Sequence, residues 1–232
     1  MLNFLKSLHK IVLALDGETN VMMDYIDRAV HTSGPQILDV GCGYGRLLEQ
    51  MTKRGLTATG VDVNPEIVAA NVSKGLRCVT HDEFVKSNDT YDVMIMSHVI
   101  EHFSPAQLVA FMDSYLDRLK IDGQLIIATP LLSDYFYDDF DHIKPYQPTG
   151  LLLVFGSNRA QVQYYARNQL ELRDLWFRKS PFRVKFARSR YLRLPWRYGL
   201  IAIDFLSALA FVASCKLVGK IDGWIGVFER IK

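Results

Sequence analysis

The sequence predicts an α/β protein built on a doubly wound, mostly parallel β-sheet. Short apolar runs typical of buried strands alternate with stretches of helical periodicity from residue 37 onward. A glycine-rich turn at residues 41–45 follows the first apolar run directly and leads into a helix. Strands and helices that alternate at these lengths form parallel sheets with helices on both faces.

The predicted elements follow one another without an internal repeat. Asn64-Pro65 and Ser104-Pro105 are strong helix starts, because Asn and Ser cap the first amides and proline fits the first turn. Strands are expected at 37–40, 57–63, 76–80, 91–97, 124–129, 160–166 and 224–231. Helices are expected at 4–15, 20–31, 46–55, 65–75, 105–119 and 148–155.

Composition indicates one globular domain with an elaboration. The chain has 232 residues, of which 49% are hydrophobic and 22% charged, and its net charge of +2 does not by itself indicate a polyanionic partner. Cys42, Cys78 and Cys215 are odd in number and lack metal-type spacing, so reduced thiols are expected. The first fifteen residues lack the apolar core and cleavage site of a signal peptide. We therefore expect a cytoplasmic protein.

The first glycine-rich turn indicates a particular ligand chemistry. Its glycines are spaced G-x-G-x-G, at 41, 43 and 45, and not as the G-x-G-x-x-G that binds a dinucleotide pyrophosphate. Asp39 lies at the strand end, where it would repel phosphate and could pair with an ammonium group. Asp62 ends the second strand and is suited to bind the hydroxyls of a ribose. A ligand that has a ribose and a cationic end but no phosphate matches S-adenosylmethionine.

Residues 36–46 resemble motif I of the class I S-adenosylmethionine-dependent methyltransferases, and Asp62 falls where that family keeps its ribose-binding acid. The resemblance covers residues 36–166 and the last strand, and implies a seven-stranded Rossmann-like sheet whose last strand is antiparallel and lies between the fifth and the sixth. It also implies that an acid after the third strand, here Asp82, binds the adenine amino group; the alternative is a solvated turn acid. The cofactor-binding candidates are Asp39, Gly41, Cys42, Gly43, Gly45, Asp62, Val63, Asp82 and Ser97.

The catalytic candidates are His98, Glu101, His102 and His142, which follow the fourth and fifth strands. Histidine titrates near neutral pH and could accept the proton of a methyl acceptor. The stretch 98–102 resembles the E-x-x-E-H motif of ubiquinone-type O-methyltransferases and small-RNA 2′-O-methyltransferases, where a later histidine completes a divalent-metal site. Here His98 replaces the first glutamate. Such a ligand set suits zinc, manganese or iron, but we favour an acid/base or positioning role over a metal.

Three regions are expected: an N-terminal helical cap at 1–34, the cofactor-binding domain at 35–166 and 220–232, and an insertion at 167–219. Ten basic residues with interleaved aromatics lie between 167 and 197, and an apolar stretch follows that is too short to span a bilayer. Residues 176–215 would suit an anionic membrane surface, and also a phosphate-bearing substrate or RNA. The alternative is that this segment is a cover that packs on the sheet or on another subunit. In the second case the protein would be a homodimer.

The resemblance implies methyl transfer from S-adenosylmethionine, with a hydroxyl of a small-molecule, glycan or lipid-linked acceptor as the expected target. Two rivals remain open: an RNA methyltransferase, which the basic insertion would suit, and a cofactor-binding scaffold without catalysis, because fold alone does not establish activity. A cytoplasmic location, with peripheral contact at the inner face of the membrane, fits the first reading.

Overall fold

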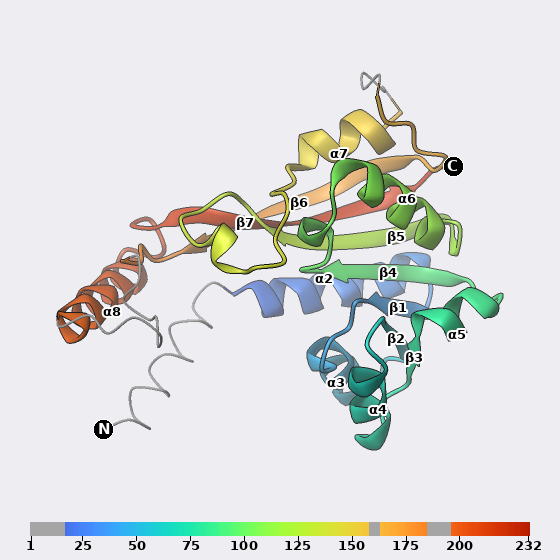
Figure 1. Ribbon diagram of the computed structural model, residues 1–232, viewed down its shortest axis with the longest axis horizontal. Coiled ribbons are helices and arrows are strands. Elements are labelled where there is room, and N and C mark those ends of the chain that lie inside the picture. The colour runs from blue at the N-terminus through green and yellow to red at the C-terminus, as the bar shows by residue number, and fades with distance from the viewer. Residues whose placement is uncertain (1–16, 158–162, 185–195) are drawn as a thin grey trace.

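The computed structural model describes residues 17–157, 163–184 and 196–232, which form a seven-stranded sheet with helices on both faces (Figure 1). The first predicted helix, at 4–15, lies outside these residues. The elements in chain order are α2 (Glu18–Ser33), β1 (Ile37–Val40), α3 (Arg46–Lys53), β2 (Ala58–Asp62), α4 (Pro65–Ser73), β3 (Cys78–Thr80), α5 (His81–Lys86), β4 (Tyr91–Ser97), η1 (Ile100–His102), α6 (Pro105–Leu116), β5 (Leu119–Pro130), η2 (Phe136–Asp138), α7 (Pro148–Phe155), β6 (Leu170–Ser180), α8 (Arg197–Ala213) and β7 (Lys220–Arg230).

The strand order, β3-β2-β1-β4-β5-β7-β6, reverses between β1 and β4. The pairs among β1 to β5 are parallel, and β7 is antiparallel to both β5 and β6. The predicted fold class is confirmed, including the antiparallel last strand between the fifth and the sixth. Ligands bind such open sheets beyond the carboxyl ends of the strands, beside the point of reversal.

The predicted position of the sixth strand was wrong. The strand lies at Leu170–Ser180, and residues 163–166 of the predicted stretch are in no strand. The register of β6 shifts between Leu172 and Asp174, which breaks the period-two alternation by which a strand is recognised. Residues 170–180, which had been placed in the insertion, therefore belong to the sheet, and the insertion begins after Ser180.

Two apolar layers hold the helices on the sheet. Alternate residues of a strand point to opposite faces, so Leu38 and Val40 of β1 join one cluster while Ile37 joins the other. The first cluster includes buried residues of α5, α6 and α7, and the second those of α2 and α3. Burial of these faces on both sides of the sheet fixes the strand register.

Candidate active site

A glycine-rich loop closes the carboxyl end of β1. Gly41, Gly43 and Gly45 all adopt positive φ angles, of 67°, 51° and 80°, which side chains other than glycine rarely tolerate. A Cβ atom on Gly41 would lie 2.7 Å from Cγ2 of Val99. The loop therefore packs closely against the segment after β4, and its backbone is open to a ligand.

Asp62 lies beside this loop at the end of β2. Its Oδ2 accepts a hydrogen bond of 3.0 Å from the Gly43 amide, and its Oδ1 accepts one of 2.9 Å from the Asn64 amide. These two bonds fix the orientation of the carboxylate and leave further lone pairs on both oxygens. Asp62 is thus held ready to accept hydrogen bonds from a pair of hydroxyls.

A pocket of about 220 Å³ lies between the glycine-rich loop and the segment after β4. Gly41, Asp62, Val63, His98 and His102, all predicted site residues, line it. The sequence analysis missed the apolar wall, because the aromatic residues of α6 have the spacing of an ordinary packing face. The other lining residues are Val40, Val61, Val99, Phe103, Phe111 and Tyr115.

Asp39 is buried behind this pocket and does not line it. Its Oδ2 finds no hydrogen-bond partner among the residues that the structure describes. Burial raises the pKa of Asp39 to about 7; the Arg46 charge opposes this rise and the Asp62 charge adds to it. Near neutral pH, this carboxyl is therefore close to the point where it gains or loses its charge.

Five other cofactor-binding candidates do not line the pocket: Cys42, Gly43, Gly45, Asp82 and Ser97. Cys42 points toward α4 and β3, with its sulfur 3.4 Å from that of Cys78, and Ser97 ends β4. Asp82 is exposed in the first turn of α5. The structure thus brings Gly41, Asp62 and Val63 to the pocket wall, and leaves the role of Asp82 a prediction.

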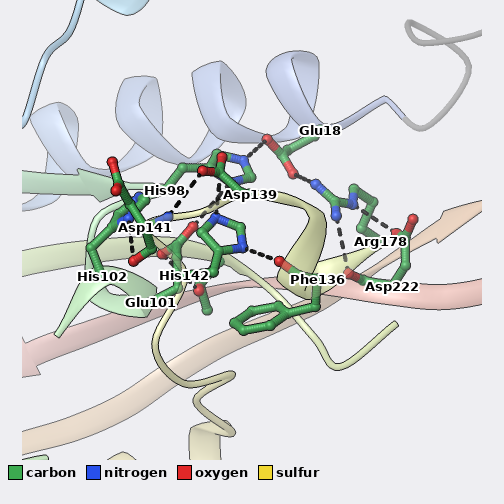
Figure 2. A network of polar contacts seen from close by, with 11 residues as sticks. Glu18, His98, Glu101, His102, Phe136, Asp139, Asp141, His142, Arg178 and Asp222 are labelled. Carbon is green, nitrogen blue, oxygen red and sulfur yellow. Dashed lines mark hydrogen bonds and ion pairs between the residues drawn. The ribbon is translucent and has the colours of Figure 1, made fainter. Parts of the chain in front are cut away.

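His98 adopts a left-handed backbone conformation, with φ of 57°, and is held between two carboxylates (Figure 2). Its Nε2 lies 2.8 Å from Oε1 of Glu18, and its Nδ1 lies 3.3 Å from Oε1 of Glu101. Burial alone would lower the pKa of His98, but the hydrogen bonds and charges of Glu101 and Glu18 raise it to about 9. His98 is therefore a cation at neutral pH and is not free to accept a proton.

Glu18 extends this network to the far edge of the sheet. Its Oε2 pairs with Nη1 of Arg178 on β6, whose Nε in turn lies 2.8 Å from Oδ1 of Asp222 on β7 (Figure 2). Burial would raise the pKa of Glu18, but His98 and Arg178 lower it to about 2. Sequence reasoning missed both Glu18 and Arg178, since each lies far along the chain from the residues that it contacts.

His102 and His142 lie side by side, with ring centroids 5.0 Å apart. Nδ1 of His102 lies 3.2 Å from the Asp141 carbonyl oxygen, and Nδ1 of His142 lies 2.7 Å from that of Phe136. A carbonyl oxygen only accepts hydrogen bonds, so each Nδ1 is the donor and each Nε2 keeps its lone pair in the neutral ring. Both rings can therefore take up a proton at Nε2.

The residues Glu101, His102 and His142 also fit a divalent metal ion. One possible ligand atom from each lies within 4.8 Å of the others, and a histidine that donates Nδ1–H to a carbonyl is typical of a metal ligand. The cationic ring of His98, however, is 3.3 Å from Oε1 of Glu101, where it competes with a second cation for that carboxylate. Oε2 of Glu101 accepts a hydrogen bond from Thr129.

The sheet order, the glycine-rich loop and the acid that ends β2 define a class I methyltransferase fold with a cofactor-type pocket. The sequence matches the model of a family described as a methyltransferase domain over residues 16–197. The chain belongs to this methyltransferase family, which confirms the resemblance first seen at residues 36–46.

Ubiquinone biosynthesis O-methyltransferases are among its relatives. The one from Rhizobium leguminosarum bv. trifolii (strain WSM2304) is 30% identical over 104 residues, which cover 41% of this chain and 40% of that protein. The one from Xylella fastidiosa (strain M23) is 30% identical over 119 residues, which cover 47% of each. The chain thus spans less than half of the length of these curated relatives.

Solved structures share the fold over most of the chain. A SAM dependent methyltransferase from Archaeoglobus fulgidus matches with a TM-score of 0.57 and 19% identity, over 91% of this chain and 94% of that one. Magnesium protoporphyrin IX methyltransferase from Synechocystis PCC 6803 with bound SAH matches with a TM-score of 0.60 and 11% identity, over 96% and 86%. The fold is therefore the same, at sequence identities too low to compare substrates.

Proposed function

We propose that this protein transfers a methyl group from S-adenosylmethionine to a hydroxyl of a small-molecule, glycan or lipid-linked acceptor. The observation that carries the proposal is a single pocket that both Asp62 and His102 line. Asp62 binds the ribose hydroxyls of the cofactor, and the glycine-rich loop lies along its backbone. The family membership and the O-methyltransferase relatives support the reaction class.

The aromatic wall supports an adenosine ligand in this pocket. Phe103 and Phe111 stack with ring centroids 4.3 Å apart, and Phe111 lies 4.9 Å from Tyr115. These rings offer a purine an apolar surface, while Asp62, which lines the same pocket, binds the sugar. The pocket thus suits a nucleoside whose reactive end extends toward the histidines.

Methyl transfer needs little from the protein beyond positioning and a proton acceptor. The acceptor oxygen attacks the methyl carbon, the bond from that carbon to the sulfonium sulfur breaks, and S-adenosylhomocysteine leaves. The hydroxyl proton passes to Nε2 of His102 or His142. His98, which is already protonated, places a positive charge beside Glu101 and helps to hold the loop after β4 in position.

A divalent ion held by Glu101, His102 and His142 would polarise the acceptor hydroxyl and lower its pKa. The charge of His98 favours the metal-free reading. Chelation decides between them: after EDTA treatment the protein is expected to keep its activity. Loss of activity that a divalent ion restores would assign these residues to a metal site.

The experiment that tests the proposed function uses labelled S-adenosylmethionine and fractionated cell extract. A labelled, base-stable ether in the lipid or small-molecule fraction is the expected product. Label in a nuclease-sensitive fraction would favour the RNA methyltransferase. Tight cofactor binding with no labelled product in any fraction would favour a cofactor-binding scaffold.

A further inference from the structure

Helix α8 exposes a large apolar surface to solvent. Asp204, Ala208 and Phe211 form a buried stripe along the helix, at the spacing of one helical face. Five large apolar side chains on the other sides of the helix are 40–63% exposed: Ile203, Phe205, Leu206, Leu209 and Val212. A helix that is apolar on its outer as well as its inner face lacks a polar surface toward water, which marks an interaction site.

The segment that contains α8 is also strongly basic. Between Asp174 and Asp222 the sequence has ten Lys and Arg residues and one acid, Asp204, which leaves seventeen basic and twenty-four acidic residues in the rest of the chain. Asp204 is 4% exposed, and its Oδ1 accepts a hydrogen bond of 2.7 Å from the Val184 amide. The one negative charge of this segment is therefore turned inward, and the rest of the molecule carries the opposite net charge.

The segment leaves the sheet at the edge where the pocket lies. Ser180 at the end of β6 pairs with Lys220 at the start of β7, and Gly223 of β7 pairs with Pro130 at the end of β5. The carboxyl ends of the parallel strands face this same edge. In Figure 1, α8 accordingly projects beyond the ends of β6 and β7 on the side to which β4 points.

We propose that α8 and the basic residues that flank it in the sequence, other than the ion-paired Arg178, bind the surface of an anionic lipid bilayer, with the helix lying along the interface. In the part of the chain that the structure describes, no helix has the length and apolarity needed to cross a membrane. Interfacial helices bury apolar side chains at the headgroup boundary while neighbouring Lys and Arg residues contact anionic lipids. Trp196 and Tyr198, both exposed at the start of α8, are the residue types enriched at that depth.

The charge distribution favours lipid over the other occupants. RNA would engage the basic residues but would leave Leu206 and Leu209 in water, because phosphates offer no apolar surface. A second copy of the chain would cover the apolar face but would bring two basic segments together, which repel each other. An anionic bilayer buries the apolar side chains and attracts the basic residues at the same time. It repels the acidic remainder of the molecule.

The proposal is tested by cosedimentation of the full chain with vesicles of phosphatidylcholine, with and without phosphatidylglycerol. Binding is expected to the anionic vesicles at moderate salt and to fall as the salt concentration rises. Leu206→Gln with Leu209→Gln should weaken it by roughly ten- to a hundred-fold, since two leucines no longer enter the interface. The matched control, Val72→Gln with Ile121→Gln, replaces two equally exposed residues elsewhere on the surface and should not change binding.

The basic residues are tested separately. Arg188, Arg190 and Arg193 lie outside the described residues but within the basic stretch of the sequence. A basic residue near an anionic surface contributes about a five-fold gain in partitioning, so changing all three to Gln should lower partitioning by roughly a hundred-fold. None of these changes should alter the dissociation constant for S-adenosylmethionine. A failure of the membrane proposal can therefore be distinguished from a failure of the proposed reaction.

Four results would overturn the proposal. Wild-type protein that stays in the supernatant with both kinds of vesicle would do so, as would leucine variants that bind as well as the wild type. A dimer in light scattering that the leucine variants dissociate, without vesicle binding by the wild type, would assign the face to a subunit contact. Vesicle binding that appears only after removal of residues 1–16 would assign the face to that segment.

Discussion

Nε2 of His98 and Oε1 of Glu18 lie 2.8 Å apart, and this contact joins α2 to the loop that follows β4. Glu18 is the first residue of α2, whereas His98 lines the pocket at the end of a central strand. The side chain of Glu18 is 10% exposed and that of His98 is 37% exposed, so solvent screens the pair only in part. Helix α2 therefore holds a residue of the pocket wall in place and is not only a cover.

Glu18→Gln should lower the pKa of His98 toward its ordinary value and destabilise the fold by roughly 1–3 kcal/mol, the range for loss of a charged hydrogen-bond partner. The carboxylate of Glu18 stabilises the fold above its unfolded pKa of 4.5 and loses this effect as the pH falls toward 2. The imidazolium of His98 stabilises it fully below 6.5 and loses this effect as the pH rises through 9. The difference in melting temperature between variant and wild type should therefore be largest from pH 4.5 to 6.5 and narrow by pH 9.

The control for this variant is Asp27→Asn, also on α2, which removes an exposed ion pair with Arg54 at the end of α3. Its effect on stability should be small, because exposed pairs contribute little. NMR titration of the His98 ring measures the pKa directly. An unchanged His98 pKa in Glu18→Gln would mean that Glu101 alone holds the proton.

Asp62→Ala should weaken S-adenosylmethionine binding by roughly 1.5–3 kcal/mol, the range for a charge-assisted hydrogen bond. Calorimetry measures this, and circular dichroism shows whether the variant keeps its fold after loss of the two amide contacts of Asp62. Asp82→Ala, measured in the same way, tests whether the exposed Asp82, which does not line the pocket, binds the adenine amino group. Equal dissociation constants for folded Asp62→Ala and wild type would remove Asp62 from the cofactor site.

Asp39 should make both stability and cofactor affinity depend on pH. Its folded pKa of about 7 lies above its ordinary value of 3.8, so its contribution to stability is greatest below about pH 4 and falls as the pH rises through 7. Asp39→Asn should therefore raise the melting temperature of the free protein above neutral pH. Differential scanning calorimetry across this range measures the effect.

If the ionised form of Asp39 pairs with the ammonium group of the cofactor, wild-type affinity should rise roughly ten-fold from about pH 6 to about pH 8. Asp39→Asn should bind more weakly and lose this rise. A variant that keeps the full pH dependence would show that another group is responsible.

His102→Ala or His142→Ala should lower the rate of turnover by about 10²- to 10⁴-fold, the usual contribution of a general base, with little change in cofactor affinity. Single-turnover kinetics separates chemistry from binding. The rate of turnover in the His98→Gln variant should fall less, since its ring already carries a proton. A larger loss for His98→Gln than for His102→Ala or His142→Ala would contradict these assignments.

The fold was predictable because its signals are local. Asn64 caps α4, because its Oδ1 accepts a hydrogen bond of 2.9 Å from the Glu66 amide. At the start of α6, the side chain of Gln107 accepts a hydrogen bond of 3.1 Å from the Ser104 amide. Both helix starts were predicted from the sequence. Strand β6 was misplaced because charged residues and a register shift hide its alternation. A local pattern fails where pairing with a distant strand decides the structure.

The candidate site was predictable only in part, for the same reason. Gly41, Asp62 and His102 follow strands that end at one edge, so their common location follows from the sheet alone. The contact between Glu18 and His98 joins residues eighty positions apart, and the protonated state of His98 depends on it. Spacing along the chain carries no information about such a pair.

The pairing of Ser180 with Lys220 means that residues 181–219 leave and re-enter the sheet at neighbouring points. A tight turn that joins β6 directly to β7 would preserve the strand pairs and the pocket. The basic apolar segment can therefore change in length or sequence while the strand pairs and the pocket stay in place.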